Sequence, residues 1–258
     1  SETVTLEAVG SNASGYSGTL APETVTITAT IASQTGMVPD MGWAADAPGN
    51  WDDASRWEND PVPGPSDVVV IDFPDLPQIT HSSGTDTVGG IINLAGNLVM
   101  AGGTLTAGQI ENDSLLTLTG GDLVLSTGSG ATGTLFNTLT GVIDIAPAGQ
   151  PVTLGAVGAA AIANAGILEM TGAGSANIDA ALNDTGAIVV RGGTLSLNGG
   201  GSASGFNITA GAGGVLAFGT TATGGSHTFS ITGGFFAPAN VVVDGGTLDV
   251  SAASAVIF

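Results

Sequence analysis

The feature that most constrains the fold is a phrase that recurs from about Val88 onward. An apolar residue precedes Asn, Gly follows within a few residues, and a short alternating apolar run comes next, often closed by Gly-Gly-x-Leu. Each repeat in such a chain buries its apolar face only against its neighbours, which favours a rod of stacked coils. The recurring asparagines, spaced by 19 to 27 residues, are Asn93, Asn112, Asn137, Asn164, Asn183 and Asn207.

The repeats predict an all-β protein, a parallel β-helix (β-solenoid) of about eight coils over residues 87–258. Alternating residues should point inward, as in Ile143/Ile145 and Ile188/Val190. Asn tolerates turn geometry, and its amide can bond a like amide in the next coil, so the asparagines are interpreted as architectural. Their uneven spacing excludes a repeat of fixed length.

Composition divides the chain into two regions near residue 87. All three tryptophans and eight of the 11 prolines precede it, whereas 35 of the 43 glycines follow it. We therefore expect an amino-terminal strand segment at 1–41, a Trp- and Pro-rich cap at 42–86 and the solenoid at 87–258.

The first segment contains two stretches that alternate polar and apolar residues, at 3–9 and 24–31. Both are typical of strands with one buried face, and the second presents Val25 and Ile27 on that face. They could form a hairpin packed within the chain. Alternatively they could form an arm that pairs with a neighbouring subunit.

Residues 42–72 carry a more specific pattern. Asn50-Trp51-x-Asp-x-x-x-Trp57 is followed by Val-Pro-Gly-x-x-Asp and a Val-rich run ending at Ile71. This resembles the segment that opens the β-solenoid in secreted bacterial surface proteins, including autotransporter-type passengers and large adhesins. The resemblance implies an amino-terminal cap on a parallel β-helix, and it implies no activity.

A cap is also what the physics of a solenoid requires, because an open end exposes apolar core and unpaired strand edges. Trp43, Trp51 and Trp57 are interpreted as cap and core, with a sugar-stacking platform as the alternative. We expect Arg56 to pair with a nearby carboxylate such as Asp52 or Glu58, or to stack on tryptophan.

The net charge and the cysteine content limit which binding partners and which chemistry the chain can have. The net charge is −20, with 2 basic and 22 acidic residues, so nucleic acid and anionic membranes are disfavoured. The chain has no cysteine, which fits a secreted bacterial protein and removes thiolate chemistry. No apolar run is long enough for a membrane span.

Catalytic and cofactor chemistry is not indicated. His81, placed in a turn before the repeats, and His227, near the far end, each lack acidic neighbours close in sequence. The scattered aspartates are interpreted as solvated or turn-capping residues, and any calcium binding as adventitious. We therefore expect no enzyme, no cofactor and no metal site. These aspartates include Asp122, Asp144, Asp179, Asp184, Asp244 and Asp249.

The sequence favours a structural role. Its apolar tail, Val256, Ile257 and Phe258, could close the last coil, dock on a neighbouring subunit or form part of a carboxyl-terminal secretion signal. The expected function is a secreted, self-assembling subunit of an extracellular filament or surface layer on the cell surface. An adhesin or phage-fibre module that binds a glycan or receptor is the alternative, and a polysaccharide-degrading enzyme is a third, weaker one.

Overall fold

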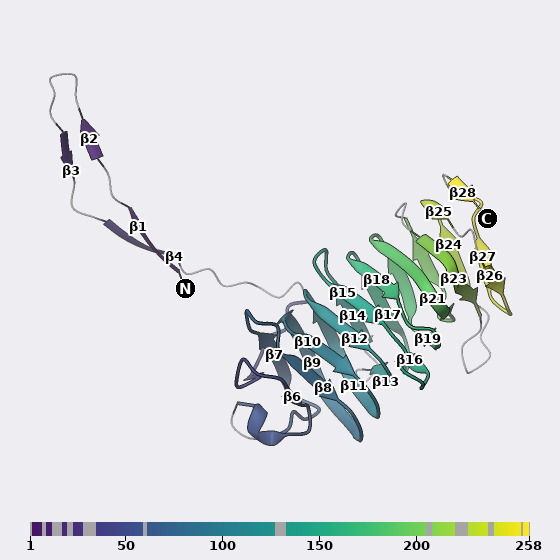
Figure 1. Cartoon of the computed structure of the whole chain (residues 1–258), viewed down its shortest axis with the longest axis horizontal. Helices are drawn as coiled ribbons and strands as arrows, with labels where there is room; N and C mark the ends of the chain where they lie inside the picture. Colours follow the sequence, from purple (N-terminus) through teal and green to yellow (C-terminus); the bar gives the residue numbers. More distant parts are fainter. Residues whose placement is uncertain are drawn as a thin grey trace. The chain divides into compact units, whose positions relative to one another are not determined.

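In the computed structural model the described residues are 35–58, 61–126, 133–204, 208–219, 227–236, 240–253 and 255–257. Only the backbone is described for 235–236 and 255–257 and, among the first 34 residues, for 2–6, 9–11, 17–19 and 23–27. Two compact units result, Ser1–Ser33 and Gln34–Phe258. Figure 1 shows the second unit as a stack of parallel strands.

The second unit is a parallel β-solenoid of about eight turns, which confirms the predicted fold class. Its strands form three parallel sheets that run the length of the stack, and we name them sheet I, sheet II and sheet III. Within each sheet, a strand pairs in register with the strand of the coil before it and the coil after it. Long strands bend from one sheet into the next, as β9 (Thr85–Ala95) and β21 (Ala187–Leu197) do.

Sheet I comprises β5 (Met41–Gly42), β7 (Val68–Asp72), the second halves of β9 and β11 (Thr104–Asn112), β14 (Gly133–Asn137), β17 (Ala160–Asn164), β20 (Ala181–Asp184), β22 (Gly201–Ala203), β24 (Thr228–Ile231) and β27 (Thr247–Asp249).

Sheet II comprises β6 (Gly49–Asn50), β8 (Gln78–His81), β10 (Asn97–Met100), β12 (Leu115–Leu118), β15 (Val142–Ile145), β18 (Ile167–Met170), the first halves of β21 and β23 (Ile208–Phe218), β25 (Gly234–Phe236) and β28 (Ala255–Ile257).

Sheet III comprises the first halves of β9 and β11, then β13 (Gly121–Leu125), β16 (Val152–Ala156), β19 (Ser175–Ile178), the second halves of β21 and β23, and β26 (Asn240–Val243).

The core follows from the alternation of each strand. Ile143 and Ile145 are fully buried, as are Ile188 and Val190, so the predicted inward positions are confirmed. The residues between them face outward and are only partly buried. Because each inward residue stacks on its counterpart in the next coil, a single apolar column fills the interior.

A ladder of buried asparagines runs along four consecutive strands of sheet I, near the end of β9 and at the ends of β11, β14 and β17. The Nδ2 of Asn93 donates to Asn112 Oδ1 at 2.8 Å, Asn112 to Asn137 at 2.8 Å, and Asn137 to Asn164 at 2.7 Å. Asn164 Nδ2 then donates to Asp184 Oδ1. The predicted amide-to-amide stacking is therefore confirmed at these four asparagines.

The ladder has a direction. Each Nδ2 also donates to a backbone carbonyl of the following coil, such as Val142 O for Asn112 and Ala187 O for Asn164. Since a carbonyl can only accept, these bonds fix which end of each amide is nitrogen. Every amide dipole thus points its positive end toward Asp184, where a carboxylate accepts the last hydrogen bond.

Asn183 is not a member of this ladder, contrary to the sequence-based expectation. The register pairs Ala163 with Asn183 and Asn164 with Asp184, so Asn183 faces solvent. The reason is that Leu182 points inward. Because side chains alternate along a strand, the next inward residue is Asp184, and Asn183 points outward. Asn207 lies outside the described residues.

The turn glycines beside the ladder are required by close stacking. A Cβ at Gly141 would overlap Asn112 O, and a Cβ at Gly166 would overlap Gly141 O. The backbone of one turn therefore rests directly on the backbone of the turn before it.

The described residues of the first unit include two antiparallel pairs. β1 (Glu2–Leu6) pairs with β4 (Glu23–Ile27), and β2 (Val9–Ser11) pairs with β3 (Ser17–Thr19). Val25 and Ile27 lie on β4, and their side chains are outside the described part of the chain.

The segment that enters the second unit is held on the outside of the early coils. Thr35 donates to Glu111 Oε2 through its backbone N–H at 3.3 Å and its hydroxyl at 2.9 Å. The Met37 side chain lies so close to Gly90 that a Cβ there would meet its sulfur. No helix among the described residues is long and apolar enough to cross a membrane.

Candidate functional sites at the two ends of the solenoid

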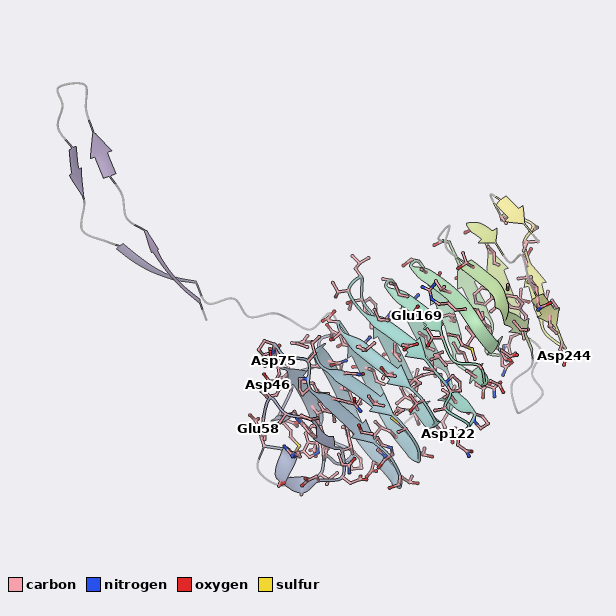
Figure 2. The ribbon with its side chains drawn as sticks, viewed as in Figure 1. Asp46, Glu58, Asp75, Asp122, Glu169 and Asp244 are labelled. Carbon is pink, nitrogen blue, oxygen red and sulfur yellow. The ribbon has the colours of Figure 1, made fainter. Side chains whose placement is uncertain are left out.

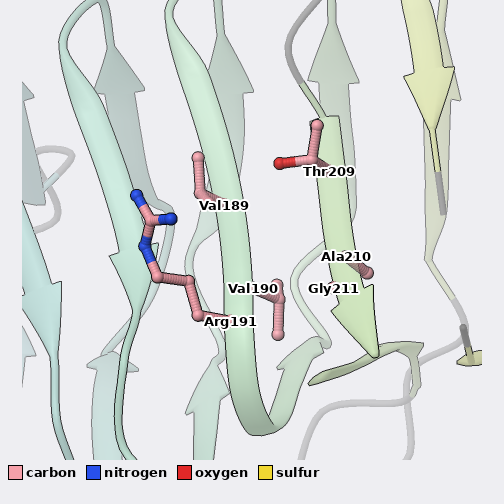
Figure 3. A pocket seen from close by; sticks show the side chains of 6 residues that line it. All are labelled: Val189, Val190, Arg191, Thr209, Ala210 and Gly211. Carbon is pink, nitrogen blue, oxygen red and sulfur yellow. The ribbon is translucent and has the colours of Figure 1, made fainter. Parts of the chain in front are cut away.

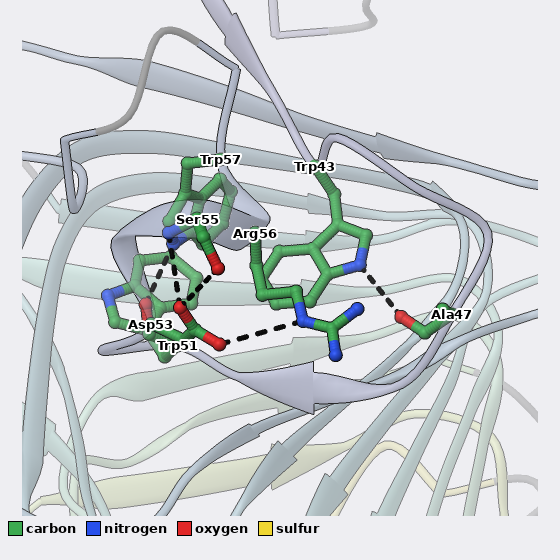
Figure 4. Close-up of polar contacts among 7 residues, drawn as sticks. All are labelled: Trp43, Ala47, Trp51, Asp53, Ser55, Arg56 and Trp57. Atoms are coloured by element: carbon green, nitrogen blue, oxygen red, sulfur yellow. Dashed lines mark hydrogen bonds and ion pairs between the residues drawn. The ribbon is translucent and has the colours of Figure 1, made fainter.

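Three tryptophans close the amino-terminal end of the second unit. Trp43, Trp51 and Trp57 have at most 2% of their surface exposed. The Trp57 ring meets Trp43 and Trp51 edge-on, with centroids 4.9 and 4.8 Å apart. Trp57 Nε1 donates to Trp51 O and Trp43 Nε1 to Ala47 O (Figure 4). With their faces buried, the rings offer no free platform on which a sugar could stack.

A short turn holds the outer side of this cap. Asp53 precedes the 3₁₀ helix η1 (Ala54–Arg56) and accepts from the N–H and hydroxyl of Ser55, which lowers the pKa of the Asp53 carboxyl. Arg56 Nε lies 3.6 Å from Asp53 Oδ2. Arg56 therefore pairs with a neighbouring carboxylate, that of Asp53, because one 3₁₀ turn brings position i+3 back over position i.

Beneath the cap lies a cluster of titratable groups that the sequence did not predict. His81, the last residue of β8, is fully buried rather than in an open turn. Its Nδ1 donates to Gly102 O at 2.9 Å, and its Nε2 lies 2.9 Å from Asp86 Oδ2. Asp52 completes the group, since one donor atom from each of the three residues lies within 4.8 Å of the others.

Electrostatics in this cluster follow from the two carboxylates. The pKa of Asp52 is raised, first by loss of solvent and then by the negative charge of Asp86, with His81 acting in the opposite direction. Two acids beside one imidazole form a focus of negative charge on the described surface. No sequence signal pointed to it, because Asp52 belongs to the cap loop while His81 and Asp86 belong to different strands.

The carboxyl-terminal coil differs from the capped end. β26, β27 and β28 each pair with a strand of the preceding coil, and among the described residues no strand pairs with their other edge. Val242 and Val243 are 44% and 51% exposed. Val256 and Ile257 lie on β28, their side chains outside the described part, and Phe258 is not described.

The lateral surface of the solenoid is acidic, and where two acidic side chains stack, each has a hydrogen-bond donor beside it. Figure 2 shows Asp122, Glu169 and Asp244 at the outer surface of three different coils. Asp144 and Glu169 are register partners on neighbouring strands. Thr171 Oγ1 donates to Asp144 at 2.7 Å, and Arg191 Nε donates to Glu169 at 3.1 Å.

Asp184 is an exception to the expected solvated aspartates, because only 2% of its surface is exposed. Burial raises the pKa of its carboxyl, and hydrogen bonds from Asn164 and the Gly186 backbone partly offset this. Asp184 Oδ2 has no hydrogen-bond partner. His227, by contrast, is exposed.

A shallow groove lies over the only other arginine. It is lined by Val189–Arg191 of β21 and Thr209–Gly211 of β23 (Figure 3). The register between these strands shifts here, because three steps on β23 match two on β21. The groove's polar groups are the exposed guanidinium of Arg191, which is already paired with Glu169, and the hydroxyl of Thr209.

The chain matches no family model, no curated protein and no solved structure at a significant level.

Proposed function

We propose that this chain is a structural subunit of an extracellular filament or surface layer, and that it assembles through the ends of its solenoid. The observation that carries the proposal is the terminal coil, with one strand edge unpaired among the described residues and Val242 and Val243 exposed. Unpaired edges with apolar side chains are the surfaces onto which other chains add.

The two ends suggest how assembly proceeds. At the capped end the tryptophans are buried and a polar loop covers them, whereas the terminal coil has unpaired strand edges. A contact between the two ends of neighbouring copies would therefore join unlike surfaces. A contact between unlike surfaces continues indefinitely unless it closes into a ring, which favours filaments. The second surface is either the capped end of the next copy, by stacking, or its strands β1–β4, by strand addition.

Composition supports a role outside the cell. A chain with a net charge of −20 repels its own copies, so assembly should need salt that screens the repulsion. The absence of cysteine and the buried, hydrogen-bonded asparagine ladder suit a rod whose stability is independent of redox conditions.

The proposal is tested by electron microscopy of the purified chain across a salt series. Long filaments are expected at or above physiological ionic strength, and fewer at low salt. Discrete short rods under all conditions would contradict assembly and favour the adhesin or fibre module, for which glycan binding would then be measured.

The interface is tested with paired variants that add the same charge. Replacing Val242 and Val243 with Asp should abolish filaments because it places charges on the proposed contact. Replacing Leu139 and Val157 with Asp is the matched control, since these side chains are also exposed and apolar but lie on lateral loops. Equal loss in both would attribute the effect to net charge and contradict the assigned surface.

Deletion of residues 1–33 separates the two modes of assembly. Strand addition predicts that the truncated chain remains folded but forms no filaments. Stacking of the solenoid ends predicts unchanged filaments. The deleted segment is a compact unit of its own, so the solenoid should retain its circular dichroism spectrum.

A further inference from the structure

His81, Asp86 and Asp52 pose a problem of protonation. Gly102 O can only accept, so the Nδ1 of His81 carries the proton in that hydrogen bond. A neutral ring then points the lone pair of Nε2 at Asp86 Oδ2, 2.9 Å away. Two lone pairs at this distance repel, so either one proton lies between Nε2 and Oδ2 or both atoms bind a metal ion.

The arrangement has the features of a metal site. Metal-binding histidines nearly always donate their other ring N–H to a carbonyl or carboxylate, as His81 does to Gly102 O. In a tetrahedral site with bonds of about 2.1 Å, two ligands of one ion lie about 3.4 Å apart. Nε2 and Oδ2 lie 2.9 Å apart, so the Asp86 side chain would move outward by about 0.5 Å to share an ion with His81.

Asp52 supplies a third ligand. Ligands of one ion at this bond length lie at most about 4.2 Å apart. All three donor atoms lie within 4.8 Å of one another, and Asp52 is exposed, so a small rotation of its side chain completes the set. Water would fill the remaining positions.

We propose that Asp52, His81 and Asp86 bind a divalent transition-metal ion of the zinc class. Imidazole nitrogen disfavours calcium and magnesium, which prefer all-oxygen ligands, and favours ions such as Zn²⁺. Two carboxylates with a neutral imidazole also match a divalent charge. This proposal is the opposite of the sequence-based expectation of no metal site.

The ion would fasten the cap to the solenoid. Asp52 follows the buried Trp51, whose backbone N–H donates to Thr80 O of β8. His81 is the last residue of β8 in sheet II, and Asp86 lies on the first half of β9 in sheet III. One ion would therefore join the cap loop and two strands, and the proposal stands independently of filament assembly.

Binding is tested by titrating the full chain with Zn²⁺ in isothermal calorimetry, with excess Mg²⁺ to occupy surface carboxylates. One saturable site per chain is expected, with a rise in the thermal midpoint of unfolding. Asp52→Asn and Asp86→Asn should each weaken binding by about tenfold or more. Asp46→Asn is the matched control, an exposed acid in the same loop region, and should bind as the parent does.

A spectroscopic measurement reports the ligand directly. The chain has two histidines, so the ring nitrogens of His81 are resolved by NMR once His227→Gln identifies the other. Zn²⁺ should shift the Nε2 resonance of His81 and leave Nδ1 protonated. A Zn²⁺ titration that leaves Nε2 unchanged, or equal affinity in the Asp52→Asn, Asp86→Asn and parent chains, would overturn the proposal in favour of a protonated His81–Asp86 ion pair.

Discussion

The early and late coils of the solenoid satisfy their buried polar groups differently. From Asn93 to Asn164 the Nδ2 of each buried amide donates to the next side chain of the ladder, and tryptophans cover the end. Asn93 Oδ1, at the first step of the ladder, has no hydrogen-bond partner. From Asp184 onward the ladder ceases: Ala203 occupies the next position in sheet I, and Val242 and Val243 are exposed. The contrast teaches that one repeat pattern can build a capped region with a hydrogen-bonded ladder and an open region without one on the same core.

The stability of the chain should be more sensitive to shortening a buried side chain in the cap than to any other substitution considered below. Trp57→Ala removes the ring that contacts both other tryptophans and should lower the free energy of unfolding by about 3–5 kcal/mol. Urea unfolding monitored by fluorescence of the remaining tryptophans measures this. Leu139→Ala, at a side chain that is 85% exposed, should change stability by less than about 0.5 kcal/mol.

The ladder should be nearly as sensitive at its centre. Asn137→Ala removes the acceptor for Asn112 and the donor to Asn164, leaving buried groups unpaired, and should cost about 3 kcal/mol. Asn183→Ala is the matched control, because this asparagine lies beside the ladder but faces solvent. Similar losses for both in urea titrations would mean that the ladder contributes nothing beyond surface hydrogen bonds.

At Asp184, where the ladder ends, a substitution should raise the stability of the fold instead of lowering it. Asp184→Asn removes a buried charge while keeping the oxygen that accepts from Asn164, and should raise stability at neutral pH by about 1 kcal/mol. The folded pKa of Asp184 is raised, so its contribution is fully present below the unfolded value of about 3.9 and is lost as pH rises through the folded pKa.

Unfolding measured across this pH range should therefore show the parent losing stability relative to Asp184→Asn as pH rises. Asp249 provides the reverse case, because hydrogen bonds from Ser251 lower its pKa. Its contribution is present above about pH 3.9 and is lost as pH falls through the folded value. A parent and Asp184→Asn with parallel pH profiles would contradict the assignment of a buried charged carboxyl.

The smallest effect on stability is expected at the open end. Replacing Val242 and Val243 with Asp should change the urea midpoint by the equivalent of less than about 0.5 kcal/mol, because both side chains are largely exposed in the single chain. A large loss would show that these valines hold the terminal coil together, and the absence of filaments could then not be attributed to a lost contact.

Much of the fold was predictable because stacking imposes a strict period on the chain. The inward pairs Ile143/Ile145 and Ile188/Val190 follow from alternation alone. The ladder position follows from a rule that the sequence contains: an inward apolar residue stands two places before it, as Ile162 does before Asn164. Applied to Leu182, this rule selects Asp184 and not Asn183.

The His81 cluster was not predictable, since its members come from a cap loop and two sheets and share no spacing that marks a site. Position in sequence suggested that His81 lacked an acidic partner, yet the bend between β8 and β9 returns Asp86 to its ring. Which nearby carboxylate pairs with Arg56 is decided locally, by the single 3₁₀ turn that places Asp53 within reach.

The asparagine ladder also bears on how such a chain can lengthen during evolution. Its members are separated by 19, 25, 27 and 20 residues, yet the same contact recurs at each step. Extra residues in a coil are therefore absorbed in loops without disturbing the stack. Tandem duplication of one whole coil would add one rung and about 4.8 Å of length, whereas a one-residue shift within a strand would turn its inward side chains outward. Whole coils are thus the natural unit of gene duplication and of engineered extension.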